Sequence, residues 1–135
     1  MNKNYYITTP IYYVNDKPHI GHAYTSIACD VLARFKRLDG YSVKFLTGTD
    51  EHGQKVEKAA KSQNKSPLEY ANFISKDFKS LTKTLNLSND DFIRTTEKRH
   101  ILAAQSLWSK LYENKHIYLD KYAGWYALRD EAFYS

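Results

Sequence analysis

Two histidines near the N-terminus are the residues best suited to bind a phosphate group. His19 and His22 stand three apart where a helix is expected to begin, so they can lie on one face of it. A helix N-terminus also offers free N–H groups and a partial positive charge, which bind anions. Gly21 lies between them and has no side chain, so a flat base or ribose can approach the backbone closely. Together these features favour a phosphate-binding corner.

The His-x-x-His spacing alone also fits a metal pair or two unrelated polar residues. A metal pair would need further ligands, and the neighbouring segment supplies no thiolate and no carboxylate set. Two unrelated polar residues near a helix start are the commonest case when the motif stands by itself. The spacing alone leaves all three possibilities open.

A second segment, Thr47–Gly53, carries an acidic residue at the expected end of a strand. Asp50 can hold a substrate ammonium group through a charge-assisted hydrogen bond. Alternatively, Asp50 is the N-cap of the helix that follows, a position where Asp is favoured.

The elements that must position these residues alternate between strand and helix. Strands are predicted at 5–9, 43–47 and 92–95 from their β-branched and aromatic residues, and residues 117–135 are predicted to be β. Helices are predicted at 21–39, 54–64, 67–85 and 97–115, with a loop at 10–18. This order predicts an α/β fold with a parallel sheet, in which ligands bind beyond the carboxyl ends of the strands.

Three of the helices have recognisable faces. The third begins at a capping box, Ser66-Pro67-Leu68-Glu69. Its candidate buried positions are Leu68, Phe73, Phe78, Leu81 and Leu85. The first helix has the apolar stripe Tyr24, Ile27, Val31, Leu32 and Phe35, and the last has Ile101, Ala104, Trp108, Leu111 and Tyr112.

Composition sets the broad class. The 135 residues are 42% hydrophobic and 26% charged, which is ordinary for a globular domain. The single cysteine excludes an internal disulfide framework. No apolar stretch approaches the roughly 20 residues that cross a bilayer, and no secretory signal is evident, so a cytoplasmic protein without a membrane partner is expected. The net charge of +5 suits a polyanion such as RNA, or reflects a solvated surface rich in Lys.

The histidine segment also carries a family resemblance. Pro-His-Ile-Gly-His at 18–22 matches the HIGH signature of the class I aminoacyl-tRNA synthetases. The segments 8–15, 19–24, 47–53 and 92–97 resemble the methionyl-tRNA synthetases in particular, and the similarity runs along essentially the whole chain. The resemblance implies a Rossmann-like parallel sheet. Residues 1–115 would form the first half of the nucleotide-binding catalytic domain, and 116–135 the start of an inserted, β-rich connective domain.

The resemblance implies a ligase of translation. Methionine and ATP, taken with Mg²⁺, would form methionyl-adenylate, and the methionyl group would pass to tRNA(Met). No DNA partner is expected. Because no Lys-Met-Ser-Lys-Ser stretch occurs in the 135 residues, the isolated chain is expected to be inactive.

The resemblance also implies residue roles. His19 and His22 would be catalytic and contact ATP phosphates, with Gly21 beneath the adenosine. Asp50 would bind the methionine ammonium, and Pro10, Ile11 and Tyr13 would line the amino-acid pocket. The whole signature region is Tyr12, Tyr13, Val14, Asn15, Asp16, Lys17, Pro18, His19, Ile20, Gly21 and His22.

The chain departs from many family members at an expected zinc knuckle. The stretch Gly124-Trp125-Tyr126 is followed by Ala127 and Asp130 where the first two cysteines would stand. A structural zinc site needs four N or S ligands. The chain therefore resembles the zinc-free type, and no structural zinc is expected.

Three alternatives remain. One is a different HIGH-bearing synthetase, of the leucine, isoleucine or valine type. Another is a small nucleotidylyltransferase, although the loop before His19, Tyr-Tyr-Val-Asn-Asp-Lys-Pro, fits poorly to the Gly- and Asp-bearing loop usual in those enzymes. The last is a truncated, non-catalytic remnant that binds a nucleotide or RNA.

Overall fold

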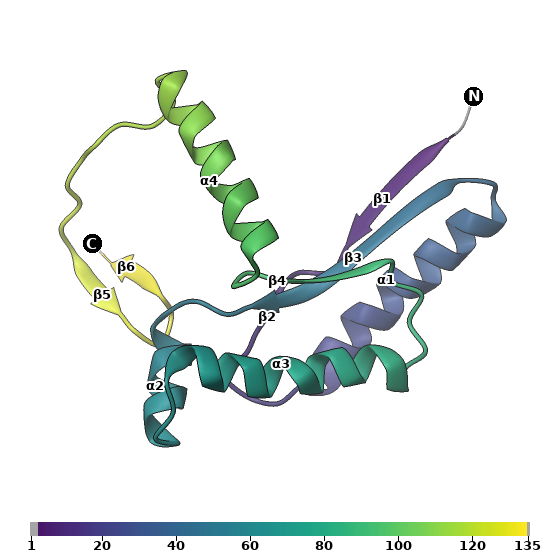
Figure 1. The fold of residues 1–135 in the computed structure, drawn as a ribbon, viewed down its shortest axis with the longest axis horizontal. Helices are drawn as coiled ribbons and strands as arrows, with labels where there is room; N and C mark the ends of the chain where they lie inside the picture. Colours follow the sequence, from purple (N-terminus) through teal and green to yellow (C-terminus); the bar gives the residue numbers. More distant parts are fainter. Residues whose placement is uncertain (1–2, 135) are drawn as a thin grey trace. The chain divides into compact units, whose positions relative to one another are not determined.

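A computed structural model describes residues 3–134 of the chain (Figure 1). These residues form two compact units, 3–100 and 101–134.

A parallel sheet centred on β3 (Ser42–Asp50) forms the first unit. It pairs in parallel with β1 (Asn4–Thr8), β2 (Tyr12–Tyr13) and β4 (Asp91–Arg94). Leu46 pairs with Thr8 of β1 and with Asp91 of β4, so these two strands lie on opposite edges of β3. The predicted parallel α/β sheet is confirmed.

Two strand predictions were incomplete. The segment 10–18, predicted to be a loop, contains β2, whose two residues pair with Thr49 and Asp50. A strand of two residues has too little pattern to be recognised from sequence. The strand predicted at 43–47 runs on to Asp50, so Asp50 ends the strand rather than following it.

The four helices lie where they were predicted, with ends shifted by no more than two residues. They are α1 (Ile20–Leu38), α2 (Gln54–Ser62), α3 (Pro67–Thr84) and α4 (Lys98–Glu113). The predicted capping box of α3 is confirmed: the Ser66 N–H donates to Glu69 Oε2 at 2.9 Å, and the Glu69 N–H donates to Ser66 Oγ at 3.3 Å.

The core of the first unit lies between β2, α2 and α3. Its buried members are Tyr12, Val14, Val56, Ala60, Tyr70, Ala71, Ile74 and Phe78. On α3 the packed face is Tyr70, Ile74 and Phe78, spaced four apart. Of the five positions predicted to be buried, only Phe78 is. Leu68 and Phe73 are exposed because they lie on other sides of α3, and Leu81 and Leu85 are partly buried.

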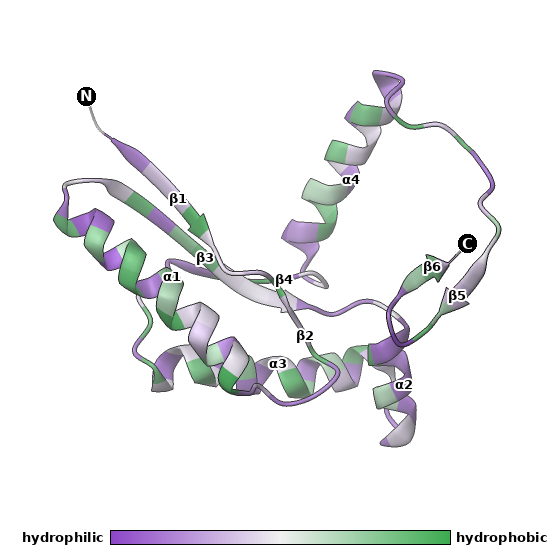
Figure 2. Cartoon of the chain, turned by 180° about the vertical axis from the view of Figure 1, so that it is seen from behind, coloured by the Kyte–Doolittle hydropathy of each residue, from purple (hydrophilic) through white to green (hydrophobic). Residues whose placement is uncertain are grey.

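The buried face of α1 is mostly polar. It consists of Ser26, Asp30 and Ala33, while all five residues of the predicted apolar stripe are exposed. Figure 2 shows hydrophobic residues recurring along this helix. Asp30 accepts hydrogen bonds from Arg34 Nε and from the Ser88 N–H and hydroxyl, each at 2.6 Å. Burial alone would raise the pKa of Asp30, but these bonds outweigh it and lower that pKa. The apolar stripe of α1 therefore does not lie on the face of the helix that is buried in this unit.

Gly48 explains how closely β4 approaches β3. A Cβ built on Gly48 would lie 2.0 Å from the backbone oxygen of Ile93. Only a residue without a side chain allows the two strands to pair at this point.

The boundary between the units falls within α4, so the second unit contains residues 101–113 of that helix and a β-hairpin. Strand β5 (Trp125–Ala127) pairs antiparallel with β6 (Ala132–Tyr134). The β structure predicted over 117–135 is therefore found only within 125–134, and residues 117–124 contain no strand. The Phe133 ring packs on Tyr122 and Tyr126, with ring centroids 5.0 and 4.9 Å away. Helix α4 buries none of its residues, so its predicted apolar stripe is exposed. Among residues 3–134, no helix has the length and apolar character needed to cross a membrane.

Candidate functional site

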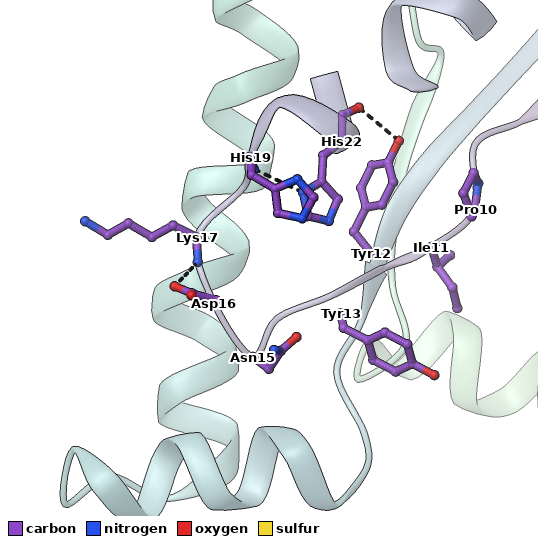
Figure 3. Close-up of a pocket in the computed structure, with 9 residues that line it drawn as sticks. All are labelled: Pro10, Ile11, Tyr12, Tyr13, Asn15, Asp16, Lys17, His19 and His22. Atoms are coloured by element: carbon purple, nitrogen blue, oxygen red, sulfur yellow. Dashed lines mark hydrogen bonds between the residues drawn. The ribbon is translucent and has the colours of Figure 1, made fainter. Parts of the chain in front are cut away.

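An open pocket of about 470 Å³ lies where β2 leads into α1 (Figure 3). Its lining residues are Pro10, Ile11, Tyr12, Tyr13, Asn15, Asp16, Lys17, His19 and His22. All nine belong to the residues singled out from the sequence. Five others do not line it: Val14, Pro18, Ile20, Gly21 and Asp50. Val14 is instead a fully buried core residue.

The two histidines hold each other at the start of α1. His19 is the N-cap, and its Nδ1 accepts the Gly21 N–H at 3.1 Å. The His19 N–H donates to Nδ1 of His22, also at 3.1 Å. Because both Nδ1 atoms accept hydrogen bonds, each neutral ring carries its proton on Nε2. The side chains of His19 and His22 therefore each keep an Nε2–H that can donate to a ligand.

The His22 ring is held by aromatic neighbours from two other elements. Its centroid lies 4.7 Å from that of Tyr12 and 5.0 Å from that of Phe78, both edge to face. The His19 ring is 4.0 Å away. Burial, and secondarily the nearby His19, lower the pKa of His22 below its ordinary value of 6.5. The neutral form of His22 is thus favoured.

Tyr12 and Phe78 were not predicted to support the histidines. The Tyr12 hydroxyl hydrogen-bonds Ser26 Oγ at 2.9 Å and donates to the His22 backbone oxygen at 3.4 Å. Phe78 stacks on the Tyr12 ring at 5.8 Å. The sequence marks Phe78 only as a buried helix position, and nothing local links it to a histidine 56 residues away in the chain.

Gly21 has a second reason to be glycine. A Cβ there would lie 2.9 Å from Cε1 and 3.1 Å from Nδ1 of His19. Both distances are tighter than ordinary packing, so any side chain at position 21 displaces the His19 ring or itself.

Asp50 lies at the end of β3 and not in the histidine pocket. It pairs in register with Tyr13, so the two residues share one face of the sheet. The alternative prediction, that Asp50 is a helix N-cap, is wrong, because Gly53 is the N-cap of α2 and no side chain caps it. Asp50 Oδ1 accepts a long hydrogen bond, 3.5 Å, from the His52 N–H.

The loop that connects β2 to His19 is anchored by α3. The Tyr70 hydroxyl donates to the Asn15 backbone oxygen at 3.0 Å. The Lys17 N–H donates to Asp16 Oδ1 at 2.7 Å, a bond between neighbouring residues of this loop. Residues 3–134 hold no group of three or more His, Cys, Asp and Glu that could bind a metal ion.

Comparison with known proteins identifies the family. Residues 5–135 match the family described as "tRNA synthetases class I (M)". The chain belongs to this family. The predicted resemblance to the methionine branch of the class I synthetases is confirmed.

Relatives of this class I synthetase chain are much longer than it is. The methionine–tRNA ligase of Rickettsia bellii is 63% identical over 134 residues, which cover 99% of this chain and 26% of that protein. The crystal structure of Mycobacterium tuberculosis methionyl-tRNA synthetase bound by methionyl-adenylate superposes with a TM-score of 0.93 at 51% identity. That match covers 98% of this chain and 26% of the other.

A synthetase for another amino acid is less similar. The complex of an Agrobacterium radiobacter LeuRS with tRNA and LeuAMS gives a TM-score of 0.79 at 26% identity, covering 96% of this chain and 17% of the other. These matches confirm the predicted Rossmann-like synthetase fold. This chain spans about a quarter of the curated relatives it matches.

Proposed function

We propose that this chain is a segment of a methionine–tRNA ligase and supplies part of the site that activates methionine. The observation that carries the proposal is the His19–His22 pair, which keeps two Nε2–H donors beside an open pocket at the start of α1. The similarity to a structure that binds methionyl-adenylate supports it.

The proposed reaction has two steps. A methionine carboxylate oxygen attacks the α-phosphorus of ATP in line, and the bond from that phosphorus to the bridging oxygen breaks, so that pyrophosphate leaves. The methionyl group then passes from the adenylate to the 3′ end of tRNA(Met), and AMP is released. The first step develops negative charge on phosphate oxygens, which positioned donors stabilise. His19 and His22 would be these donors, and the phosphates would lie at the positive end of α1.

The amino-acid side of the site would be built from β2 and the end of β3. Asp50 would accept hydrogen bonds from the methionine ammonium group. Pro10, Ile11 and Tyr13 would contact the side chain, and Tyr13 offers a ring edge to the thioether sulfur. Since an apolar pocket separates side chains that differ by one methylene by only about 1–3 kcal/mol, close fit to an unbranched chain would be needed.

The Mg²⁺ that accompanies ATP would be held mainly by the nucleotide's own phosphates. Mg²⁺ is usually bound through one or two carboxylates plus substrate phosphates, and Asp16 is the carboxylate that lines this pocket. We further propose that residues 1–115 belong to the catalytic domain and 116–135 to an inserted, zinc-free connective domain. The protein would act in the cytoplasm.

The test is ATP–pyrophosphate exchange in a chimaera. In it, this chain replaces the 134 matching residues of the Rickettsia bellii ligase. Methionine-dependent exchange is expected, together with no exchange by the isolated 135-residue chain, which lacks a Lys-Met-Ser-Lys-Ser stretch. Exchange driven instead by leucine, isoleucine or valine, or a chimaera that binds ATP without exchange, would overturn the proposal.

A further inference from the structure

A buried carboxylate lies next to Asp50 and takes no part in the proposed chemistry. Glu51 is 3% exposed. Its oxygens accept hydrogen bonds from Arg94 Nε at 2.7 Å and Arg94 Nη2 at 2.9 Å. Thr49 Oγ1 donates to Oε1 at 2.8 Å, and Thr96 Oγ1 donates to Oε2. The buried charge is therefore paired in a bidentate geometry and well supplied with hydrogen bonds.

This Glu51 cluster joins two strands and a helix. Arg94 is the last residue of β4, and its Nη2 also donates to Asn72 Oδ1 on α3 at 2.6 Å. The Glu51 N–H donates to Thr95 Oγ1 at 2.9 Å. The Thr95 N–H donates to the Thr49 backbone oxygen at 3.2 Å. Side-chain and main-chain bonds thus tie the end of β3 to β4.

Asp50 lies between two anchored neighbours. Thr49 is fully buried and Glu51 nearly so. Because side chains alternate along a strand, Asp50 points to the opposite face, which it shares with Tyr13. Any shift of the main chain at 49–51 therefore moves the Asp50 carboxylate directly.

We propose that Glu51 is a positioning residue that, through Arg94, fixes the main chain at Asp50 so that Asp50 can meet the methionine ammonium group. The inference rests on the proposed function. His19 and His22 are held by a different set of bonds, at the start of α1. Loss of the Glu51–Arg94 pair therefore weakens recognition of methionine much more than recognition of ATP.

The experiment compares Glu51→Gln with Glu57→Gln in the chimaera. Gln keeps the size of the side chain but removes its charge, and Glu57 is a matched control because it pairs with Lys61 at 2.8 Å on the surface. The KM for methionine in pyrophosphate exchange is expected to rise about 10- to 100-fold in Glu51→Gln, the range for losing a charge-assisted hydrogen bond to substrate. The KM for ATP should stay within about threefold, and Glu57→Gln should match the parent.

A purely structural role would give a different result. Partial unfolding lowers the active fraction and hence kcat for both substrates, while both KM values stay unchanged. Active-site titration measures that fraction. Unchanged KM values, or equal rises for methionine and ATP, would overturn the inference.

A milder variant covers the case in which Glu51→Gln does not fold. Thr96→Val removes one hydrogen bond to the carboxylate and keeps the shape of the side chain. It should raise the KM for methionine about three- to tenfold, again without a matching change for ATP. If it does not, the inference fails. If the unaltered chimaera shows no methionine-dependent exchange, the proposed function itself fails. If the chimaera is active and Glu51→Gln behaves like Glu57→Gln, only the inference fails.

Discussion

Helices α1 and α3 begin with the same reciprocal hydrogen-bond arrangement, built from different side chains. At α3 the hydroxyl of Ser66 and the carboxylate of Glu69 cap each other's backbone. At α1 the ring nitrogens of His19 and His22 form the box. Ser66 Oγ also donates to Glu69 Oε2 at 2.6 Å, so the hydroxyl hydrogen of Ser66 is used within the box.

An imidazole differs because, when one ring nitrogen accepts a hydrogen bond, the other carries a proton and can donate. Capping uses Nδ1, and Nε2–H remains for a ligand. The two boxes thus separate roles that a sequence motif alone cannot separate: the α3 box starts a helix, and the α1 box starts a helix and presents donors to a pocket. Substitutions in the two boxes should therefore affect different properties of the protein.

The largest effect is expected when the N-cap of α1 is removed. In the chimaera, His19→Ala should lower the rate of methionyl-adenylate formation by about 10²- to 10³-fold, because a donor to the transition state is lost. Ser66→Ala is the matched control and should leave the rate within about threefold, because neither Ser66 nor Glu69 lines the histidine pocket. Pyrophosphate exchange measures both. A His19→Ala rate within about threefold of the parent would remove His19 from the mechanism.

A methyl group at position 21 should act through the same ring. Gly21→Ala places a Cβ against His19 and is expected to lower exchange by about 10- to 100-fold, as misplacement of a catalytic group by roughly an ångström does. If displacement of His19 is the cause, the double variant with His19→Ala should be no slower than His19→Ala alone. Additive losses would show that Gly21 acts independently, for example through contact with the nucleotide.

The α3 box should matter for stability instead. Ser66→Ala should reduce the free energy of unfolding by about 1 kcal/mol, as loss of an N-cap hydroxyl does. Urea unfolding followed by circular dichroism measures it. Ser80→Ala, an exposed position inside α3, is the control and should be neutral or slightly stabilising. Equal effects of the two variants would mean that the box contributes nothing beyond helix propensity.

The smallest effects are expected in the pH dependence of stability. The two capping boxes should lose their contributions to stability in different pH ranges. The pKa of His22 is lowered from 6.5, so the folded chain binds fewer protons than the unfolded chain just below that pH. Its contribution is complete above pH 6.5 and is lost as the pH falls below that value. The pKa of Glu69 is lowered from 4.5 by the hydrogen bonds from Ser66, so its contribution is lost only below pH 4.5.

Two variants with uncharged side chains test which residue causes the loss of stability in each pH range. His22→Gln should abolish the slope of the unfolding free energy just below pH 6.5. Glu69→Gln should reduce the slope below pH 4.5, where Asp30, whose pKa is also lowered, contributes as well. Urea unfolding measured across about pH 3.5–7.5 gives both slopes. A His22→Gln chain that keeps the slope of the parent just below pH 6.5 would assign that window to another group.

Local patterns predicted most of the fold. The capping box at Ser66, the helix ends and the parallel sheet depend on nearby residues and on strand order, and they are as expected. Burial was predicted less well, because a packed face depends on partners elsewhere in the chain. Asp30 is buried because Ser88, 58 residues later, binds it, and no periodicity shows this.

The candidate site divides in the same way. The residues of the histidine pocket are nearly contiguous in sequence, so a motif could locate them. The residues that support the pocket and Asp50 could not be located in this way, because Phe78 reaches His22 from α3 and Arg94 of β4 reaches Glu51, next to Asp50. Their positions follow from the register of the sheet and the packing of α3, which no local segment encodes.

At position 19, helix stability and the proposed activity favour different residues. Histidine is not among the preferred N-cap residues, and Ser, Asp or Asn would cap α1 better. Directed evolution that selected only for thermal resistance would therefore replace His19 and keep the helix. The surviving variants would be more stable but would lack the His19 donor of the proposed phosphate site, a trade-off that is common where function and folding favour different residues at one position.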